Sequence, residues 1–206
     1  LVIESITISK LSVSYKEFFR SWRNPLGKIS GIEALSNLSL NVYQGDVMAL
    51  IGKNGAGKST LLKAIAGLLR PTSGKITTKG RTILLAGADP GFFPDSTGRR
   101  NVQELASAYG ISDSEMSEFC ENIFEFANLG DAIDRNVRGY STGMRGKLGF
   151  GFITGLKPEI LLIDETLGVG DAEFRSKAQS RLKEFVKSSG TVLISTHSLG
   201  LARELV

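Results

Sequence analysis

Cysteine and histidine are almost absent from this sequence, whose 206 residues include one of each. A single cysteine cannot form an internal disulfide, and one cysteine with one histidine cannot supply the four ligands of a structural zinc site. These absences exclude a small secreted domain stabilised by disulfides and indicate a reducing, cytosolic setting.

Long apolar runs are also missing. A membrane-spanning helix needs about 20 consecutive apolar residues, whereas the most apolar stretches here, residues 160–163 and 191–194, are far shorter. If a membrane is involved, another chain must therefore cross it. The first residue is Leu1 and not Met, so we expect a chain that has been shortened at its start. No signal-peptide pattern follows it.

No dense block of one charge occurs either. Lys and Arg number 25 and Asp and Glu 21, which leaves a net charge of +4. The basic residues are scattered, so we expect no nucleic-acid partner. With 41% hydrophobic and 22% charged residues, the composition excludes a disordered chain and predicts one globular domain over residues 1–206.

Hydrophobic patterns divide the chain into two kinds of strand. Residues 6–13 and 38–42 nearly alternate between apolar and polar, which predicts half-buried strands that pair antiparallel. Residues 47–51, 160–163 and 192–194 are short continuous apolar runs, typical of buried parallel strands. Residues 58–69, which follow the run at 47–51, have the spacing of a helix. So do residues 172–187, which lie between the runs at 160–163 and 192–194.

Between these segments lies a polar, helix-favouring block at residues 98–139, with helical segments near residues 102–109 and 116–126. A longer helical segment runs from about Ser141 to Lys157, so the predicted helical subdomain spans about residues 98–157. We therefore predict an α/β fold with a mainly parallel sheet, an antiparallel β portion and an inserted helical subdomain.

The strongest motif follows the strand at residues 47–51. Residues 52–59 match G-x-x-x-x-G-K-S between a strand and a helix, where glycine backbone N–H groups and the helix N-terminus can converge on phosphate oxygens. Lys58 is expected to reach the β- and γ-phosphates and Ser59 to offer its hydroxyl to Mg²⁺. The motif predicts that the α/β core is a P-loop NTPase core. The alternative is a glycine-rich turn without a ligand. The predicted ATP-binding residues of this loop are Gly52, Asn54, Gly55, Ala56, Gly57, Lys58, Ser59 and Thr60.

Two carboxylates follow the apolar run at residues 160–163. Asp164 stands where a Mg²⁺-binding carboxylate is expected, and Glu165 could polarise a water molecule as a general base. The alternative is a solvated loop that opens the next helix.

This combination resembles the ATPase domain of ATP-binding cassette (ABC) transporters. Residues 140–144, Tyr-Ser-Thr-Gly-Met, stand where that family has its L-S-G-G-Q signature and keep Ser141 and Gly143. Residues 169–171 resemble the D-loop, and His197 resembles the switch histidine that contacts the γ-phosphate. The resemblance implies catalysis by Lys58, Glu165 and His197, with Ser141 and Gly143 supplied by a second copy so that two cassettes enclose two ATP molecules.

Two further positions concern the same resemblance. Tyr15 resembles the aromatic residue that stacks on adenine, although it could equally be a core or edge residue. The glutamine of the family's Q-loop is missing, since its expected place near residues 87–89 holds Gly-Ala-Asp. Asp89 is a candidate replacement that would act through water.

The departures from the common motifs resemble the ATPases of bacterial polysaccharide exporters, which move lipid-linked O-antigen, capsule or teichoic acid. They include the signature Tyr-Ser-Thr-Gly-Met and the segment Thr-Gly-Arg-Arg-Asn at residues 97–101. The resemblance implies an integral membrane permease as partner and a peripheral position on the cytoplasmic face of the bacterial inner membrane. It also implies that further residues follow Val206.

Two other classes remain open at this point. One is a soluble cassette ATPase that acts on nucleic acid or ribosomes. The other is a nucleotide-binding module that no longer hydrolyses ATP, against which Glu165 and His197 argue.

Residues 15–26 form an insertion-like stretch. Phe18, Phe19 and Trp22 fall at helical spacing, so we predict a short helix that gathers three aromatic side chains. Such a helix could lie at a membrane boundary and guide the substrate, or it could pack its aromatic side chains onto its own domain.

Overall fold

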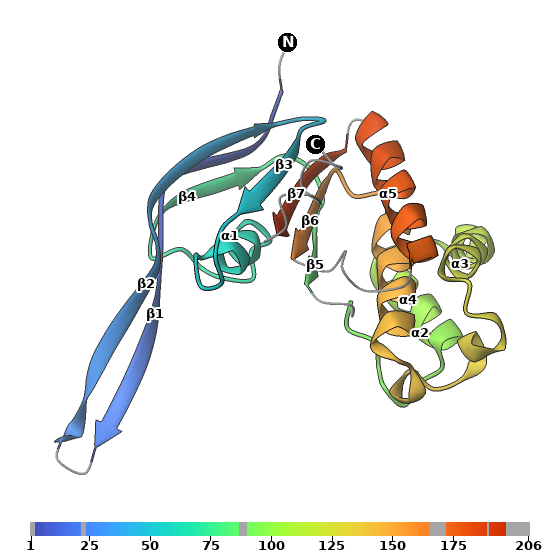
Figure 1. Ribbon diagram of the computed structural model, residues 1–206, viewed down its shortest axis with the longest axis horizontal. Coiled ribbons are helices and arrows are strands. Elements are labelled where there is room, and N and C mark those ends of the chain that lie inside the picture. The colour runs from blue at the N-terminus through green and yellow to red at the C-terminus, as the bar shows by residue number, and fades with distance from the viewer. Residues whose placement is uncertain (1–2, 22–23, 87–89, 165–171, 189, 197–206) are drawn as a thin grey trace.

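Two sheets and a group of helices make up the molecule. The computed structural model describes residues 3–21, 24–86, 90–164, 172–188 and 190–196 (Figure 1). One sheet is antiparallel with strand order β2-β1-β4, and the other is parallel with strand order β3-β7-β6-β5. The predicted combination of a parallel sheet, an antiparallel portion and helices is confirmed.

The antiparallel sheet contains β1 (Glu4–Ser21), β2 (Asn24–Tyr43) and β4 (Ser73–Thr78). Ile6 and Ile8 are buried, and so are Leu11 and Val13. In a regular strand these even-numbered and odd-numbered residues would face opposite sides of the sheet. A register shift between Ile8 and Leu11 reconciles them, because a β-bulge lets both pairs face the same side of the sheet. This irregularity is the physical reason for the imperfect alternation in the sequence.

Beyond Tyr15, β1 and β2 continue as a long two-stranded ribbon that extends away from the rest of the protein (Figure 1). Phe18 pairs with Ile29 and Phe19 with Lys28. The predicted short helix over residues 15–26 is therefore wrong. A helix of this length is marginal in water on its own, whereas the antiparallel pairing supplies backbone hydrogen-bond partners from a segment that the local spacing does not include.

The parallel sheet contains β3 (Val47–Ile51), β5 (Thr82–Ala86), β6 (Ile160–Asp164) and β7 (Thr191–Thr196). Strands β6 and β7 are buried on both faces. Ile160, Leu162 and Leu193 belong to one core cluster, whereas Leu161 and Ile163 belong to the other. Burial on both faces explains why these strands read as continuous apolar runs. The sequence analysis did not predict β5.

Helix α1 (Lys58–Ile65) covers one face of the parallel sheet, and α5 (Ala172–Lys187) lies on the opposite side (Figure 1). Helix α1 ends four residues earlier than predicted. Gly67 adopts a φ of 74°, and the N–H groups of Leu68 and Leu69 both donate to the carbonyl of Lys63. A left-handed glycine directly after a helix is a common stop signal, so residues 66–69 form the cap.

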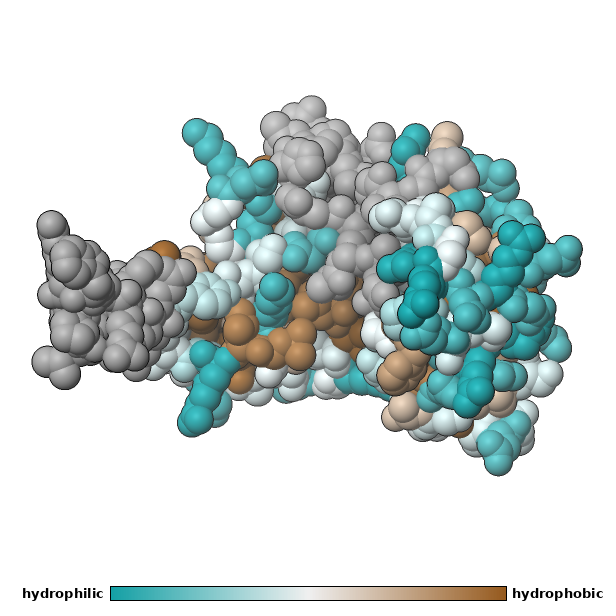
Figure 2. Space-filling model, turned by 90° about the horizontal axis from the view of Figure 1, so that it is seen from below, coloured by the Kyte–Doolittle hydropathy of each residue, from teal (hydrophilic) through white to brown (hydrophobic). Residues whose placement is uncertain are grey.

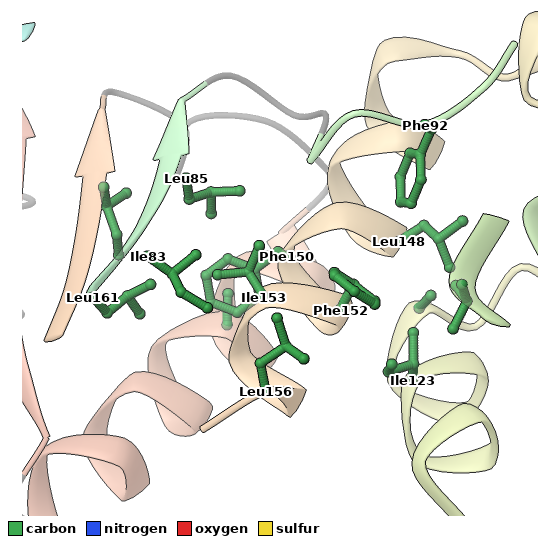
Figure 3. Close-up of a cluster of buried hydrophobic side chains, with 14 of the residues drawn as sticks. Ile83, Leu85, Phe92, Ile123, Leu148, Phe150, Phe152, Ile153, Leu156 and Leu161 are labelled. Carbon is green, nitrogen blue, oxygen red and sulfur yellow. The ribbon is translucent and has the colours of Figure 1, made fainter. Parts of the chain in front are cut away.

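The helical part contains α2 (Gly98–Ala108), α3 (Asp113–Ala127) and α4 (Thr142–Gly155), with the short 3₁₀ turns η1 (Gly130–Asp134) and η2 (Val137–Gly139). Helix α4 lies between the parallel sheet and α3, and both of its sides are buried (Figure 3). Phe152 of α4 forms edge-to-face contacts with Tyr109 and Phe119. These contacts join the helices to one continuous core with the sheet.

Candidate functional site

The glycine-rich loop, residues 52–57, joins β3 to the N-terminus of α1. Gly57 adopts a φ of 86°, and a Cβ atom placed there would lie 2.6 Å from the carbonyl oxygen of Ala34. Gly55 adopts a similar φ of 83° with open space around it. Two left-handed glycines so close together turn the loop sharply, and at Gly57 even a methyl group would collide with β2.

The side chain of Lys58 folds back over this loop. Its Nζ donates to the carbonyl oxygens of Gly52, at 2.8 Å, and Lys53, at 3.1 Å. The ammonium group therefore lies beside the backbone of the loop and the positive end of α1, where an anion would be favoured. Residues 47–88 contain seven Lys or Arg and no Asp or Glu, so the surrounding segment adds to this positive potential.

Asp164 lies at the end of β6 and connects two other elements. Its Oδ1 accepts a hydrogen bond from Ser59 Oγ at 3.0 Å and another from Ser195 Oγ of β7. The structure thus brings together both residues that the sequence predicts for Mg²⁺. Among the described residues no cluster of three His, Cys, Asp or Glu could hold a metal. A hydroxyl and one carboxylate nevertheless fit Mg²⁺, because this ion often takes one or two carboxylates and completes its shell with phosphate and water.

Ser195 is a residue that the sequence analysis missed. It lies opposite Asp164 in the parallel register of β6 and β7 and is fully buried. Its hydroxyl holds the carboxylate at the strand end and so acts as a positioning group. The apolar run before Ser195 resembles the run before Asp164, and this likeness is the one signal that could have indicated it.

Tyr15 forms one wall of a cleft of about 470 Å³ above the loop. Its hydroxyl lies 3.1 Å from Thr60 Oγ1, and 40% of the residue is exposed. Ile32, the cross-strand partner of Tyr15, lines the same cleft and is 57% exposed, and sequence analysis missed it. Tyr15 is therefore not a core residue. The other cleft residues are Glu33, Ala34, Asn54, Gly55, Ala56, Gly57, Lys58, Ser59 and Thr60.

Ser141 and Gly143 lie elsewhere in the same chain. Ser141 caps α4, because its Oγ accepts a hydrogen bond from the Met144 N–H at 3.2 Å. The two residues belong to the helical part, across the parallel sheet from α1 (Figure 1). Within one chain, therefore, Ser59, Asp164 and Tyr15 lie together around the glycine-rich loop. Ser141 and Gly143 lie apart from them. Ser141 is exposed and open to another molecule.

Tyr140, Gly98 and Asn101 belong to the segments that depart from the common family motifs, and each has a structural role. Tyr140 is buried, donates its hydroxyl hydrogen to the Ala132 carbonyl oxygen at 2.7 Å, and packs directly against Gly98. A side chain at Gly98 would collide with that hydroxyl. Asn101 is fully buried, and its amide binds the backbone of Phe93 in both directions. These contacts fasten the segment that precedes α2.

Figure 2 shows the face at which the parallel strands end, seen from below. Hydrophilic side chains crowd the helical half, while apolar side chains gather near the middle of the view.

Several predicted residues lie outside the described residues: Glu165, His197, Asp89 and the D-loop-like residues 169–171.

Comparison with known proteins agrees with this geometry. A family model described as ABC transporter matches residues 35–168. The chain is 37% identical over 206 residues to the ABC transporter protein AbcA of Aeromonas salmonicida, covering 97% of this chain and 67% of that protein. It is 43% identical over 166 residues to the O-antigen export system ATP-binding protein RfbB of Klebsiella pneumoniae, covering 81% and 68%.

A third relative is the teichoic acids export ATP-binding protein TagH of Listeria innocua, at 36% identity over 86% of this chain and 53% of that protein. Among solved structures, the ATP binding subunit of an ABC transporter superposes with a TM-score of 0.82 at 24% identity, covering 98% of this chain and 82% of that chain. A dimeric ATP-binding cassette bound to ADP and Pi gives 0.80 at 21% identity, covering 97% and 90%. These structures share the fold.

Proposed function

Because this chain belongs to the ABC transporter family and is an ATP-hydrolysing component of an ABC transporter, we propose that it powers the export of a lipid-linked polysaccharide such as O-antigen, capsule or teichoic acid. The proposed substrate class rests on the names of relatives at 36–43% identity, which are O-antigen and teichoic acid export proteins. None of the relatives described above is named for an action on nucleic acid or ribosomes, so their names do not support that alternative.

The proposal assigns a role to each site residue. Lys58 and the backbone of the glycine-rich loop bind the phosphates of ATP, and Tyr15 stacks on the adenine ring. Ser59 and Asp164 hold Mg²⁺, which when bound supplies positive charge to the β- and γ-phosphates. Glu165 acts as the general base and His197 contacts the γ-phosphate. The contact between Ser59 and Asp164 supports the Mg²⁺ assignment most directly.

A second copy completes the site. Ser141 caps α4 and Gly143 lies in its first turn, on the side of the parallel sheet opposite the helix that follows the glycine-rich loop (Figure 1). A helix N-terminus with small residues can approach a phosphate closely. Two chains arranged head to tail would therefore place Ser141 and Gly143 of one copy against ATP held by Lys58 of the other.

The membrane is crossed by another subunit in this proposal. Among the described residues, no helix combines the length and the apolar character that a bilayer crossing needs. We propose an integral membrane permease as that subunit, with this chain bound peripherally at the cytoplasmic face of the bacterial inner membrane. We also propose that residues 1–206 form one nucleotide-binding domain, with its helical subdomain at about residues 98–157.

Replacing Tyr15 tests the adenine-stacking role. Stacking between a base and an aromatic ring contributes about 1–3 kcal/mol, so Tyr15→Ala should weaken ATP binding by roughly 10-fold or more. Tyr15→Phe keeps the ring and should bind ATP nearly as well as the wild type. Calorimetric titration with ATP measures both, and inorganic tripolyphosphate, which has no base, should bind all three chains equally. If Tyr15→Phe lost as much affinity as Tyr15→Ala, the hydroxyl contact with Thr60 would explain the effect and stacking would not.

Export can be tested with the full-length protein in its own cells. Deleting the gene should remove the polysaccharide from the cell surface, because assembled chains stay inside, and wild-type protein should restore it. A Lys58→Ala copy should fail to restore it, while Lys63→Ala, on the exposed side of α1, should succeed. Surface labelling of the polysaccharide measures the result. Unchanged surface polysaccharide after deletion, with ribosomes or nucleic acid co-purifying, would favour the other class.

A further inference from the structure

A second cleft lies between α3, α4 and α5, far along the chain from the glycine-rich loop. Its volume is about 610 Å³, within the range of small-molecule sites. Helices α4 and α5 lie on the side of the parallel sheet opposite α1, so this cleft is separate from the ATP site (Figure 1). Its lining is mixed: basic and hydroxyl side chains lie beside the aromatic rings of Phe126 and Phe185.

Arg181 of α5 is the central group of this cleft. Its guanidinium lies 4.5 Å from the ring centre of Phe126, and its Nη2 donates to Asn122 Oδ1. Within the described part of the chain, Arg181 forms no ion pair with a carboxylate. Burial lowers the pKa of the Arg181 guanidinium, and the nearby charge of Glu184 only partly opposes this. The structure therefore holds a partly dehydrated cation whose charge is weakly compensated.

Other groups around Arg181 favour an anion. Lys157 and Lys177 line the cleft, against the single carboxylate of Glu184. Lys177 also pairs with Glu173 at 3.0 Å, on an exposed surface where such pairs contribute little. Ser176 and Ser180 are one helical turn apart on α5, so their small side chains leave the space open and offer hydroxyl donors.

We propose that this cleft binds a phosphoryl group. An arginine whose plane is fixed by an aromatic ring presents its remaining N–H groups as a fork that matches phosphate oxygens. Helix α3 carries five acidic residues and no Lys or Arg, so it would repel an extended polyanion beside the cleft. The ligand is therefore a compact phosphorylated compound, either in solution or as a lipid headgroup.

The test uses inorganic pyrophosphate as the probe and the ¹⁵N NMR spectrum of the whole chain as the readout. The side-chain amide of Asn122 and the backbone amide of Ser180 should shift in a saturable way, in the wild type and equally in Lys58→Ala. Arg181→Gln should weaken this binding roughly 10-fold or more, the worth of a charge-assisted bidentate contact. Lys183→Gln removes the same charge from the same helix outside the cleft and should change affinity less than 2-fold, a rough bound for a distant exposed charge.

A second variant guards against a folding defect in Arg181→Gln. Ser180→Glu keeps both Arg181 and Phe126 and adds a carboxylate to the cleft, so it should abolish the shifts by repelling the anion. Phosphatidylglycerol vesicles test whether the ligand is a lipid headgroup. If the protein floats with the vesicles only when Arg181 is present, and pyrophosphate causes no shifts, the phosphoryl group belongs to a headgroup. If neither probe responds to Arg181→Gln, or if Lys183→Gln has the same effect, the proposal is wrong.

Discussion

Replacing Lys58 with alanine is expected to weaken ATP binding by about 10²- to 10⁴-fold and to abolish ATPase activity at ordinary ATP concentrations. In the structure the ammonium group lies over the loop and binds the carbonyls of Gly52 and Lys53. The same reach lets it contact two phosphates, and each charge-assisted hydrogen bond contributes about 1.5–3 kcal/mol. Titration with ATP and a steady-state phosphate-release assay measure the two effects.

Lys63→Ala is the matched control, because Lys63 lies on the exposed side of the same helix. It removes an equal charge and should leave affinity and rate nearly unchanged. Thermal unfolding should also be similar in both variants, since neither side chain is part of the buried core. Unchanged affinity and rate in Lys58→Ala would show that the loop does not bind phosphate.

Glu165→Gln is expected to keep ATP affinity and to slow turnover by about 10²- to 10⁴-fold, the usual worth of general-base catalysis. Glutamine has nearly the shape of glutamate but cannot accept a proton from water. Slow hydrolysis should also trap two copies around ATP, so that light scattering detects a dimer in ATP and a monomer in ADP.

Glu125→Gln, on the exposed surface of α3, is the control for the loss of one negative charge. Its turnover should equal that of the wild type. Complete hydrolysis of bound ATP by Glu165→Gln in a single turnover, at the wild-type rate, would remove Glu165 from the base role.

The sequence predicts the elements of this fold best where local pattern and tertiary environment agree. Strand β6 is an uninterrupted apolar run because both of its faces are buried, and α5 spans the predicted residues 172–187. The glycine-rich loop is recognisable because phosphate binding needs backbone groups at fixed spacing, and Gly57 shows why at least one of those glycines cannot change. Asp164 meets Ser59 because the strand end and helix start are neighbours in this topology.

Other features depend on partners that are distant in sequence. The ribbon of β1 and β2 forms because Phe18 and Phe19 pair with residues on the opposite strand, information that a local helical spacing does not contain. At the position of the usual signature leucine, the hydroxyl of Tyr140 binds the Ala132 carbonyl and occupies the space that Gly98 leaves free. Ser195 acquires its role only through the register of β6 and β7.

The strand order of the parallel sheet has a consequence for how the protein is made. Strand β3, which leads into the glycine-rich loop, pairs within that sheet with β7, near the far end of the sequence. Synthesis proceeds from the N-terminus, and earlier segments usually begin to fold first. The strand that leads into the phosphate loop therefore keeps an unpaired edge during synthesis until residues 191–196 of β7 have emerged. Contacts of such long sequence separation form slowly, so nascent chains stalled before β7 should be dependent on chaperones and unable to retain ATP.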